Sequence, residues 1–266
     1  MNDFLINSNE TKVYIADCDR LKDSCLFSNY YNLMPEYRRK RIDALRFEKD
    51  KRMSLGAGIL LAYALPDYDT GNMLFEKSGR PYIADCPYYF NLSHSGNLAM
   101  AAVSSHRVGC DVEEIKEYNE KLAKRFFHEN EYLMLKNTDD ESERTRLFYR
   151  LWTLKESFIK AVGLGLSLPL DEFEIAFENN QAYVNQKVNT VRYAFKEYET
   201  ELPYCFSVCT GISSKKEASI RTEFPDEKTT PVRTELSDKN NAPVRTDVPE
   251  GADISYHFEI IDLAKL

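Results

Sequence analysis

Residues 88–113 read YYFNLSHSGNLAMAAVSSHRVGCDVE, and this stretch decides the class of the fold. Its first two apolar runs, Tyr88–Ser93 and Leu98–Ser104, have the length and composition of β-strands. The polar residues His94–Asn97 between them predict a turn. We therefore expect two strands joined by a short connection, followed by a third strand that begins at Val108.

Helical patterns flank this stretch on both sides. Residues 36–65 alternate basic and acidic residues and then run into an apolar segment of helix-compatible length. Residues 117–135 and 143–162 also fit helices, and the second range has apolar residues at spacings of three and four. Helices and strands are thus mixed throughout, which indicates an α+β or α/β protein.

Length, charge and cysteine pattern exclude several classes of protein. The chain has 266 residues, 43% of them hydrophobic, and a formal net charge of −8. It can bury a core, but an acidic balance disfavours a general binder of nucleic acid or anionic membranes. Its longest strongly apolar uncharged stretch, 53–66, is shorter than the roughly 18 residues of a membrane span. Six cysteines without a CxxC pair disfavour a zinc site or disulfide framework. No signal peptide is recognisable, so we expect a cytoplasmic protein.

One segment departs from the acidic balance of the chain. Residues 36–52 contain eight Lys or Arg and four acidic residues. A local excess of positive charge of this kind can hold an anionic ligand on an otherwise acidic protein.

Two carboxylates share one face of the strand predicted at 108–113. Because side chains alternate along a strand, Asp111 and Glu113 point to the side opposite Cys110. Like charges this close are unfavourable unless a cation lies between them, and Mg²⁺ prefers such oxygen ligands. A half-exposed strand with an acidic outer face explains the same pattern, so the hexapeptide alone leaves both interpretations open.

Two further groups of residues can carry chemistry. On the helix predicted at 143–162, Glu156 and Lys160 share one stripe, with Lys155 one step around it. Ser93 and His94 stand at the end of an apolar strand, where side chains emerge at a sheet edge. A surface Glu–Lys pair and a solvated turn histidine are the alternative interpretations. No GxSxG, HExxH or GxxxxGK[ST] motif occurs.

Taken together and in this order, FNLSHSG, VGCDVE and WTLKESFIK resemble the signatures of the Sfp-type 4′-phosphopantetheinyl transferases. Further likeness runs through SGRPYI, KRFFHENEY and GLGLSLPLDEF, so the resemblance covers about residues 12–212. It implies an α+β fold of two similar halves related by a pseudo-twofold axis, with the site in the cleft between them. We expect these halves at residues 1–104 and 105–266.

The resemblance also implies the residues of the site. Asp111, Glu113 and Glu156 match the family's ligands for Mg²⁺, with Mn²⁺ as a substitute, on the diphosphate of coenzyme A. The residues implied to bind coenzyme A itself are Lys40, Arg52, Arg80, Ser93, His94, Lys155 and Lys160. Tyr37 departs from the pattern, because it stands where the family can have a lysine.

The implied activity is transfer of the 4′-phosphopantetheine group of coenzyme A to a serine of an acyl, peptidyl or aryl carrier protein, with release of 3′,5′-ADP. Positioning and charge neutralisation dominate such reactions. Lys160 would stabilise charge that builds on the diphosphate. Glu156 is the first candidate for the base that accepts the serine proton, and Glu131 is the second. The full duplicated length favours a pseudodimeric monomer.

Two other functions fit part of the pattern. Glu114-Ile-Lys116, beside Asp111, is an acid-x-lysine arrangement that a Mg²⁺-dependent nuclease could use, but the net charge is wrong for DNA. A catalytically inactive carrier-protein adaptor would keep the fold and lack metal-dependent turnover.

A repeat precedes the last apolar segment. Arg221, Arg233 and Arg245 lie twelve residues apart in three similar units within 219–250. Their charge and proline content predict a disordered insertion at 213–251 that loops out of the fold. The segment ISYHFEIIDLAKL, residues 254–266, is apolar again, and we expect it to return to the core as a closing strand.

Overall fold

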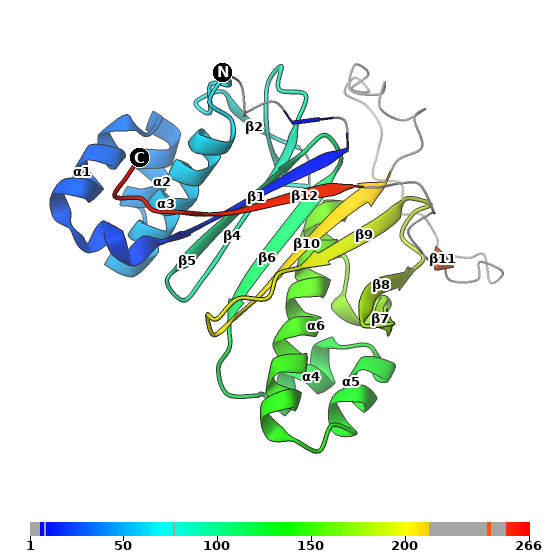
Figure 1. Ribbon diagram of the computed structural model, residues 1–266. Coiled ribbons are helices and arrows are strands. Elements are labelled where there is room, and N and C mark those ends of the chain that lie inside the picture. The colour runs from blue at the N-terminus through cyan, green and yellow to red at the C-terminus, as the bar shows by residue number, and fades with distance from the viewer. Residues whose placement is uncertain (1–5, 8, 77, 213–243, 246–253) are drawn as a thin grey trace.

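The computed structural model describes residues 6–7, 9–76, 78–212, 244–245 and 254–266, and it confirms the α+β class (Figure 1). The helices are α1 (Ser24–Leu33), α2 (Glu36–Asp43), α3 (Glu48–Ala64), α4 (Glu120–Phe126), α5 (Glu129–Lys136) and α6 (Glu141–Val162). The strands are β1 (Glu10–Asp17), β2 (Met73–Phe75), β3 (Pro81–Ile83), β4 (Tyr89–Ser95), β5 (Leu98–Ser104), β6 (Val108–Glu114), β7 (Glu174–Glu178), β8 (Gln181–Gln186), β9 (Arg192–Glu197), β10 (Tyr204–Ile212), β11 (Val244–Arg245) and β12 (Ser255–Ile261).

Two sheets form the centre of the molecule. The first has the strand order β12-β1-β5-β4, and the second has the order β6-β10-β9. Helices α1–α3 pack on the first sheet and α6 packs on the second, on the opposite side of the molecule (Figure 1). Two small sheets, β11-β8-β7 and β2-β3, lie outside this pair.

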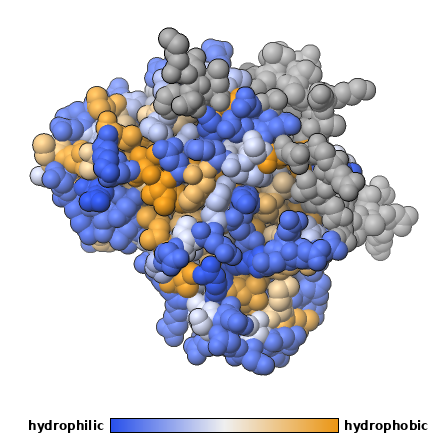
Figure 2. Space-filling model, viewed as in Figure 1, coloured by the Kyte–Doolittle hydropathy of each residue, from blue (hydrophilic) through white to orange (hydrophobic). Residues whose placement is uncertain are grey.

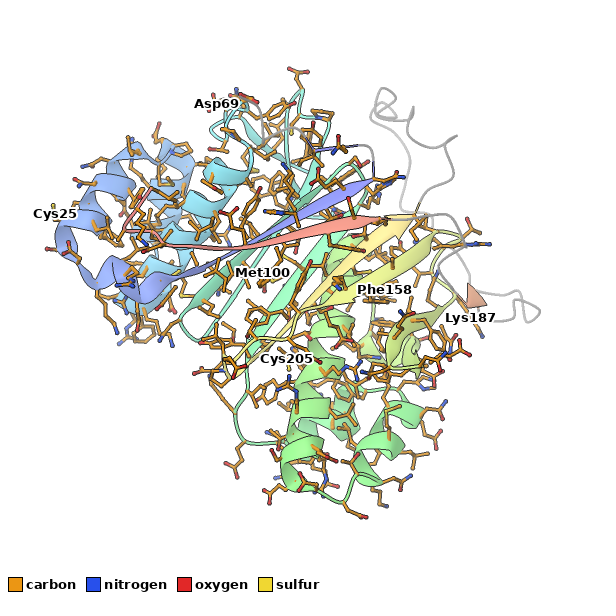
Figure 3. All side chains as sticks on the ribbon, viewed as in Figure 1. Cys25, Asp69, Met100, Phe158, Lys187 and Cys205 are labelled. Carbon is orange, nitrogen blue, oxygen red and sulfur yellow. The ribbon has the colours of Figure 1, made fainter. Side chains whose placement is uncertain are left out.

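The strand β5 shows why the sheets stack. All seven of its residues are buried, because both of its faces are covered. Ala99, Ala101 and Val103 join the core beneath α3, whereas the alternate residues Met100 and Ala102 join the core between the sheets. Figure 3 labels Met100 in this inner layer. A near-continuous apolar strand is the pattern expected of a strand buried on two faces.

The strand β6 has one face in the inner core and one face at a site. Val108, Cys110 and Val112 are fully buried between the sheets. Asp111 and Glu113 occupy the alternate positions, which confirms the prediction that both acids share the other face.

The surface over α4–α6 is largely hydrophilic, and hydrophobic residues gather near the middle of the view (Figure 2).

The predicted helices form, but two of them are interrupted. The range 36–65 contains α2 and α3, separated at residues 44–47, and the range 117–135 contains α4 and α5. The second break occurs because His128 caps α5 through a capping box with Glu131. Helix α6 begins after Asp140, whose side chain accepts a hydrogen bond from Glu143 N, and ends at Gly163 with φ 85°.

The closing strand is also present. Strand β12 runs parallel to β1, with Val13 opposite Phe258 (Figure 1). Residues 255–261 thus belong to the sheet of the first half, although they follow the second half in sequence. The division at residues 104 and 105 and the pseudo-twofold axis stay predictions.

The predicted insertion at 213–251 lies outside the described residues, apart from Val244–Arg245, which pairs with β8. Among the residues that the structure covers, none of the helices combines the length and apolarity needed to cross a bilayer.

Candidate active site

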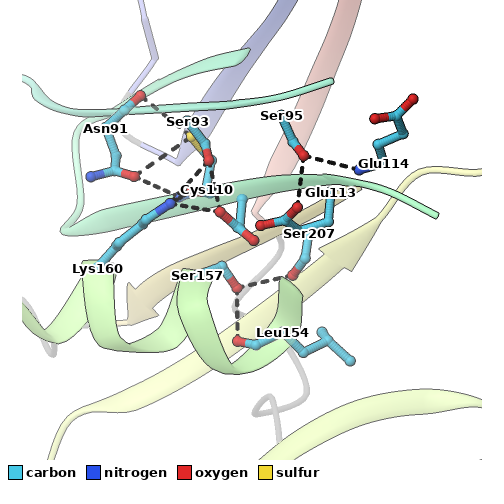
Figure 4. Close-up of polar contacts among 11 residues, drawn as sticks. Asn91, Ser93, Ser95, Cys110, Glu113, Glu114, Leu154, Ser157, Lys160 and Ser207 are labelled. Carbon is cyan, nitrogen blue, oxygen red and sulfur yellow. Dashed lines mark hydrogen bonds and ion pairs between the residues drawn. The ribbon is translucent and has the colours of Figure 1, made fainter. Parts of the chain in front are cut away.

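Strands from the two sheets meet at what we call the β4–β6 seam. Each is the edge strand of its own sheet, and no backbone ladder joins the two in the described part of the chain. Three polar side chains of β4, at every second position, bridge the gap instead (Figure 4). The three bridges are Asn91 Oδ1 to Cys110 N at 3.0 Å, Ser93 Oγ to Asp111 Oδ1 at 2.7 Å, and Ser95 Oγ to Glu113 Oε2 at 2.7 Å.

Asp111 is the centre of the site. Its side chain is 4% exposed, and its Oδ1 accepts hydrogen bonds from Ser93 and from Lys160 Nζ at 2.7 Å. Its Oδ2 is buried and has no hydrogen-bond partner. A buried carboxylate oxygen without a partner is costly, so Oδ2 is the atom of this cluster that has most to gain from a ligand.

Helix α6 reaches Asp111 because Gly109 lets it approach β6 closely. A Cβ at position 109 would collide with the Ser157 carbonyl oxygen and the Ala161 amide of α6. The close approach lets Lys160 Nζ also reach the Cys110 carbonyl oxygen, at 3.1 Å. Glu156 lies one turn before Lys160 and therefore faces the same seam.

The three acids of the site, Asp111, Glu113 and Glu156, influence one another's charge. Burial raises the pKa of Glu156, the positive charge of Lys160 opposes this shift, and Asp111 adds to it. Burial also raises the pKa of Glu113, opposed by the hydrogen bond from Ser95 and increased by Asp111. Burial alone would lower the pKa of Lys160, but Asp111 raises it overall. The site therefore has more negative charge than its one lysine neutralises.

A basic group borders the acids. His94 follows Ser93 on β4, and partial burial together with the charges of Lys160 and Arg41 lowers its pKa. Arg41 is thus the residue of α2 whose charge reaches the site. Arg52, at the start of α3, lies near Cys18, whose pKa it lowers slightly against the effect of burial.

Glu131 and Lys155 are not brought to this cluster. They form a fully buried ion pair, with Lys155 Nζ 2.5 Å from Glu131 Oε1 and 2.8 Å from the Phe173 carbonyl oxygen. Glu131 also accepts hydrogen bonds from the backbone amides of His128 and Ile175. The pair ties α5 and α6 to β7, and every oxygen of Glu131 already has a donor.

Two other predicted contacts to coenzyme A also have protein partners. Arg80 is 7% exposed, and its guanidinium donates to the carbonyl oxygens of Ala161 and Val108 at 3.0 and 2.9 Å. It thereby joins the connection after β2 to α6 and β6. Lys40 forms an exposed ion pair with Glu36 of its own helix, 2.7 Å long.

The acid cluster meets part of the requirements of a Mg²⁺ site. Within the described ranges, no three Asp, Glu, His or Cys side chains are grouped closely enough to hold an ion by themselves. Mg²⁺, however, commonly takes one or two carboxylates and completes its shell with substrate phosphates and water. The open Oδ2 of Asp111 suits that arrangement, and Glu156 faces the same seam from α6.

Sequence reasoning missed Ser95, Asn91, Arg41 and Gly109. A signal for the first two exists, since Asn91, Ser93 and Ser95 occupy alternate positions of one strand. Arg41 could not be separated from its basic neighbours on α2, and the need for glycine at 109 depends on a helix about fifty residues away.

Comparisons with known proteins identify the family of the chain. Residues 107–209, which contain the acids and α6, match the model of the 4′-phosphopantetheinyl transferase superfamily. The chain is 36% identical to 4′-phosphopantetheinyl transferase Sfp of Bacillus subtilis (strain 168) over 66% of this chain and 81% of that protein. It is 38% identical to 4′-phosphopantetheinyl transferase gsp of Aneurinibacillus migulanus over 56% of this chain, and there it spans 63% of the relative's length.

Among solved structures, a holo-(acyl-carrier-protein) synthase from Bacillus anthracis in complex with CoA (3′,5′-ADP) is similar at a TM-score of 0.36 and 19% identity. The match covers 40% of this chain and 96% of that chain. This likeness is too low to assign any residue.

Proposed function

Since the chain belongs to the Sfp-type 4′-phosphopantetheinyl transferases, we propose that it transfers the 4′-phosphopantetheine group of coenzyme A to a serine of a carrier protein. The observation that carries the proposal is the acid cluster at the β4–β6 seam. Asp111 forms an ion pair with Lys160 there and keeps a buried oxygen without a partner, and the charges of both influence the pKa values of Glu113 and Glu156. Such a site suits a cation and a phosphate ester together.

Asp111, Glu113 and Glu156 would hold the Mg²⁺ ion, which Mn²⁺ could replace. The bound ion would neutralise charge on the diphosphate of coenzyme A. Lys160 donates to Asp111, Ser93 and the Cys110 carbonyl oxygen at 2.7, 3.0 and 3.1 Å, and its side chain is 26% exposed. To contact a phosphate, its ammonium would exchange one of these three contacts for a phosphate oxygen. Its pKa is raised above the ordinary value, and it is therefore charged at neutral pH.

For the other contacts to coenzyme A we propose Ser93, His94 and Arg52, with Arg41 as an addition. Ser93 contacts Asp111, and His94 follows it on β4 within reach of the charge of Arg41. His94, Arg41 and Arg52 would supply the positive charge that a polyanion needs. Lys155, Arg80 and Lys40 bind protein groups, and for them a direct contact with coenzyme A stays a prediction.

In the reaction, the oxygen of the carrier serine bonds to the β-phosphorus of coenzyme A. The bond from that phosphorus to the oxygen bridging to the α-phosphate breaks, and 3′,5′-ADP leaves with the electron pair. The serine proton needs an acceptor, and we propose Glu156, which faces the seam from α6 one turn before Lys160. Glu131 is a poorer acceptor, because three donors already occupy its carboxylate.

The proposed partners are acyl, peptidyl or aryl carrier domains. We propose that the protein acts on them in the cytoplasm as a pseudodimeric monomer.

Intact-protein mass spectrometry of an apo carrier incubated with the protein, coenzyme A and Mg²⁺ tests the reaction. We expect a gain of one phosphopantetheine that EDTA abolishes. Asp111→Ala and Glu156→Ala should lose most turnover, whereas Glu199→Ala, at an exposed acid between β9 and β10, should retain it. Failure with several carriers despite binding of coenzyme A would favour the inactive adaptor.

A further inference from the structure

We propose that Ser95 is a positioning residue that fixes the carboxylate of Glu113 in the acid cluster, an inference that rests on the proposed function. Ser95 is the last residue of β4 and one of the three bridges of the β4–β6 seam. Within the described part of the chain, its hydroxyl is hydrogen-bonded to the cluster through the Glu113 carboxylate and the Glu114 backbone amide (Figure 4).

The hydrogen bonds of Ser95 fix the direction of its hydroxyl proton. Its Oγ accepts the backbone N–H of Glu114 at 3.1 Å and lies 2.7 Å from Glu113 Oε2. A hydroxyl has one proton, and the amide can only donate, so the proton must point to Glu113. One atom thereby holds both the side chain of Glu113 and the backbone that follows it.

The turn after Ser95 is itself clamped between the two sheets. The Asn97 backbone amide donates to the Tyr204 hydroxyl at 3.0 Å, and the Asn97 carbonyl accepts from Cys18 N at 2.8 Å. Gly96 has φ 56°, and a Cβ there would collide with the Tyr204 hydroxyl. Because only glycine fits this contact, the backbone that carries Ser95 has little freedom to move.

Glu113 needs such an anchor. It is half-buried beside Asp111 and Glu156, and like charges would turn its flexible side chain away from them. Without an anchor, a bound ion would also have to order the flexible side chain of Glu113, at a cost in rotamer entropy. Hydrogen-bonded partners of metal ligands typically change metal affinity about 10–100-fold when they are removed.

Three variants separate this role from a general structural role. Ser95→Ala removes the donor, and Ser95→Thr keeps it. Ser104→Ala is the matched control, because Ser104 on β5 is also hydrogen-bonded, to Thr11 at 2.9 Å and to the amide of His106. Ser104 pairs with Tyr89 at one end of the β4–β5 ladder, whereas Ser95 pairs with Leu98 at the other end, next to the acids. The probe is Mn²⁺ titrated into the protein with saturating coenzyme A and no carrier, with free Mn²⁺ read by electron paramagnetic resonance.

We expect Ser95→Ala to weaken Mn²⁺ binding on the order of 10-fold, whereas Ser95→Thr and Ser104→Ala stay within about twofold of the wild type. In a Glu113→Gln background, Ser95→Ala should add almost no further loss, because its effect passes through that carboxylate. If Ser95→Ala does not fold, Ser95→Cys keeps the volume and weakens the donor.

The role of Ser95 would be overturned if a folded Ser95→Ala protein bound Mn²⁺ with unchanged affinity. If the wild type still bound Mn²⁺ and modified a carrier, the proposed function would stand. An equal loss in the wild-type and Glu113→Gln backgrounds would do the same. A wild-type protein that binds no Mn²⁺ in the presence of coenzyme A would overturn the proposed function together with this inference.

Discussion

Gly109→Ala should move helix α6 away from strand β6 at the candidate site, although it replaces none of the polar side chains there. The new Cβ would lie 2.8 Å from the Lys160 Cβ and closer still to backbone atoms of Ser157 and Ala161. Ordinary contact begins near 3.4 Å, so helix α6 must retreat by at least about 0.6 Å at Lys160. The colliding backbone atoms cannot rotate away, so the helix moves as a unit.

The shift has a cost in stability and a larger cost in turnover. Overpacking of this kind costs about 1–3 kcal/mol, which lowers Tm by roughly 2–12 °C for a domain of this size. The Lys160–Asp111 contact of 2.7 Å would lengthen past the range of a charge-assisted hydrogen bond. A displacement of about 1 Å can cost on the order of 100-fold in rate, and we expect turnover to fall at least about 10-fold.

The assay combines thermal unfolding with the mass-spectrometric transfer reaction. Gly211→Ala on β10 is the control, because a Cβ there has its nearest neighbour at 3.4 Å and no collision. That variant should keep its turnover and Tm. If Gly109→Ala instead showed a Tm within about 1 °C of the wild type and turnover within twofold, the argument from helix approach would be wrong.

Three other outcomes follow from the described contacts. Glu131→Gln should lower the free energy of unfolding, measured in urea, by about 3–5 kcal/mol, because it leaves Lys155 as a buried unpaired charge. The double variant Glu131→Gln with Lys155→Met should recover part of this loss. Binding of coenzyme A near pH 6 should take up protons, because the pKa of His94 is lowered in the free protein and a nearby phosphate would raise it. Titration calorimetry in buffers of different ionisation enthalpy measures this uptake, and His94→Ala should abolish it. Tyr204→Phe should cost about 1–3 kcal/mol, read from Tm, because the Asn97 amide loses its acceptor.

Local rules of the chain explain much of the fold and part of the site. The strand at 108–114 and its two outward acids follow from alternation, which needs no knowledge of other elements. The helix at 141–162 follows from its apolar spacing. The resemblance then placed Asp111, Glu113, Glu156 and Lys160 together.

The remaining features depend on contacts between residues far apart in sequence. Lys155 and Glu156 are neighbours on α6, yet a rotation of about 100° sends the first toward Glu131 and the second toward the seam. Local pattern cannot decide this, because the burial of a lysine depends on whether a carboxylate from another helix meets it. The seam is equally non-local, since no rule of strand pairing predicts two adjacent edge strands held by side chains.

The parallel pairing of β1 with β12 has a consequence for how the protein is made. Asp17 ends β1 and Ser255 begins β12, so 238 positions of sequence separate them. At the usual 5–20 residues per second of protein synthesis, β1 waits about 12–48 s for its neighbour. During that interval its outer backbone groups have no strand to pair with, which makes the nascent chain a client for chaperones and a hazard for edge-to-edge aggregation.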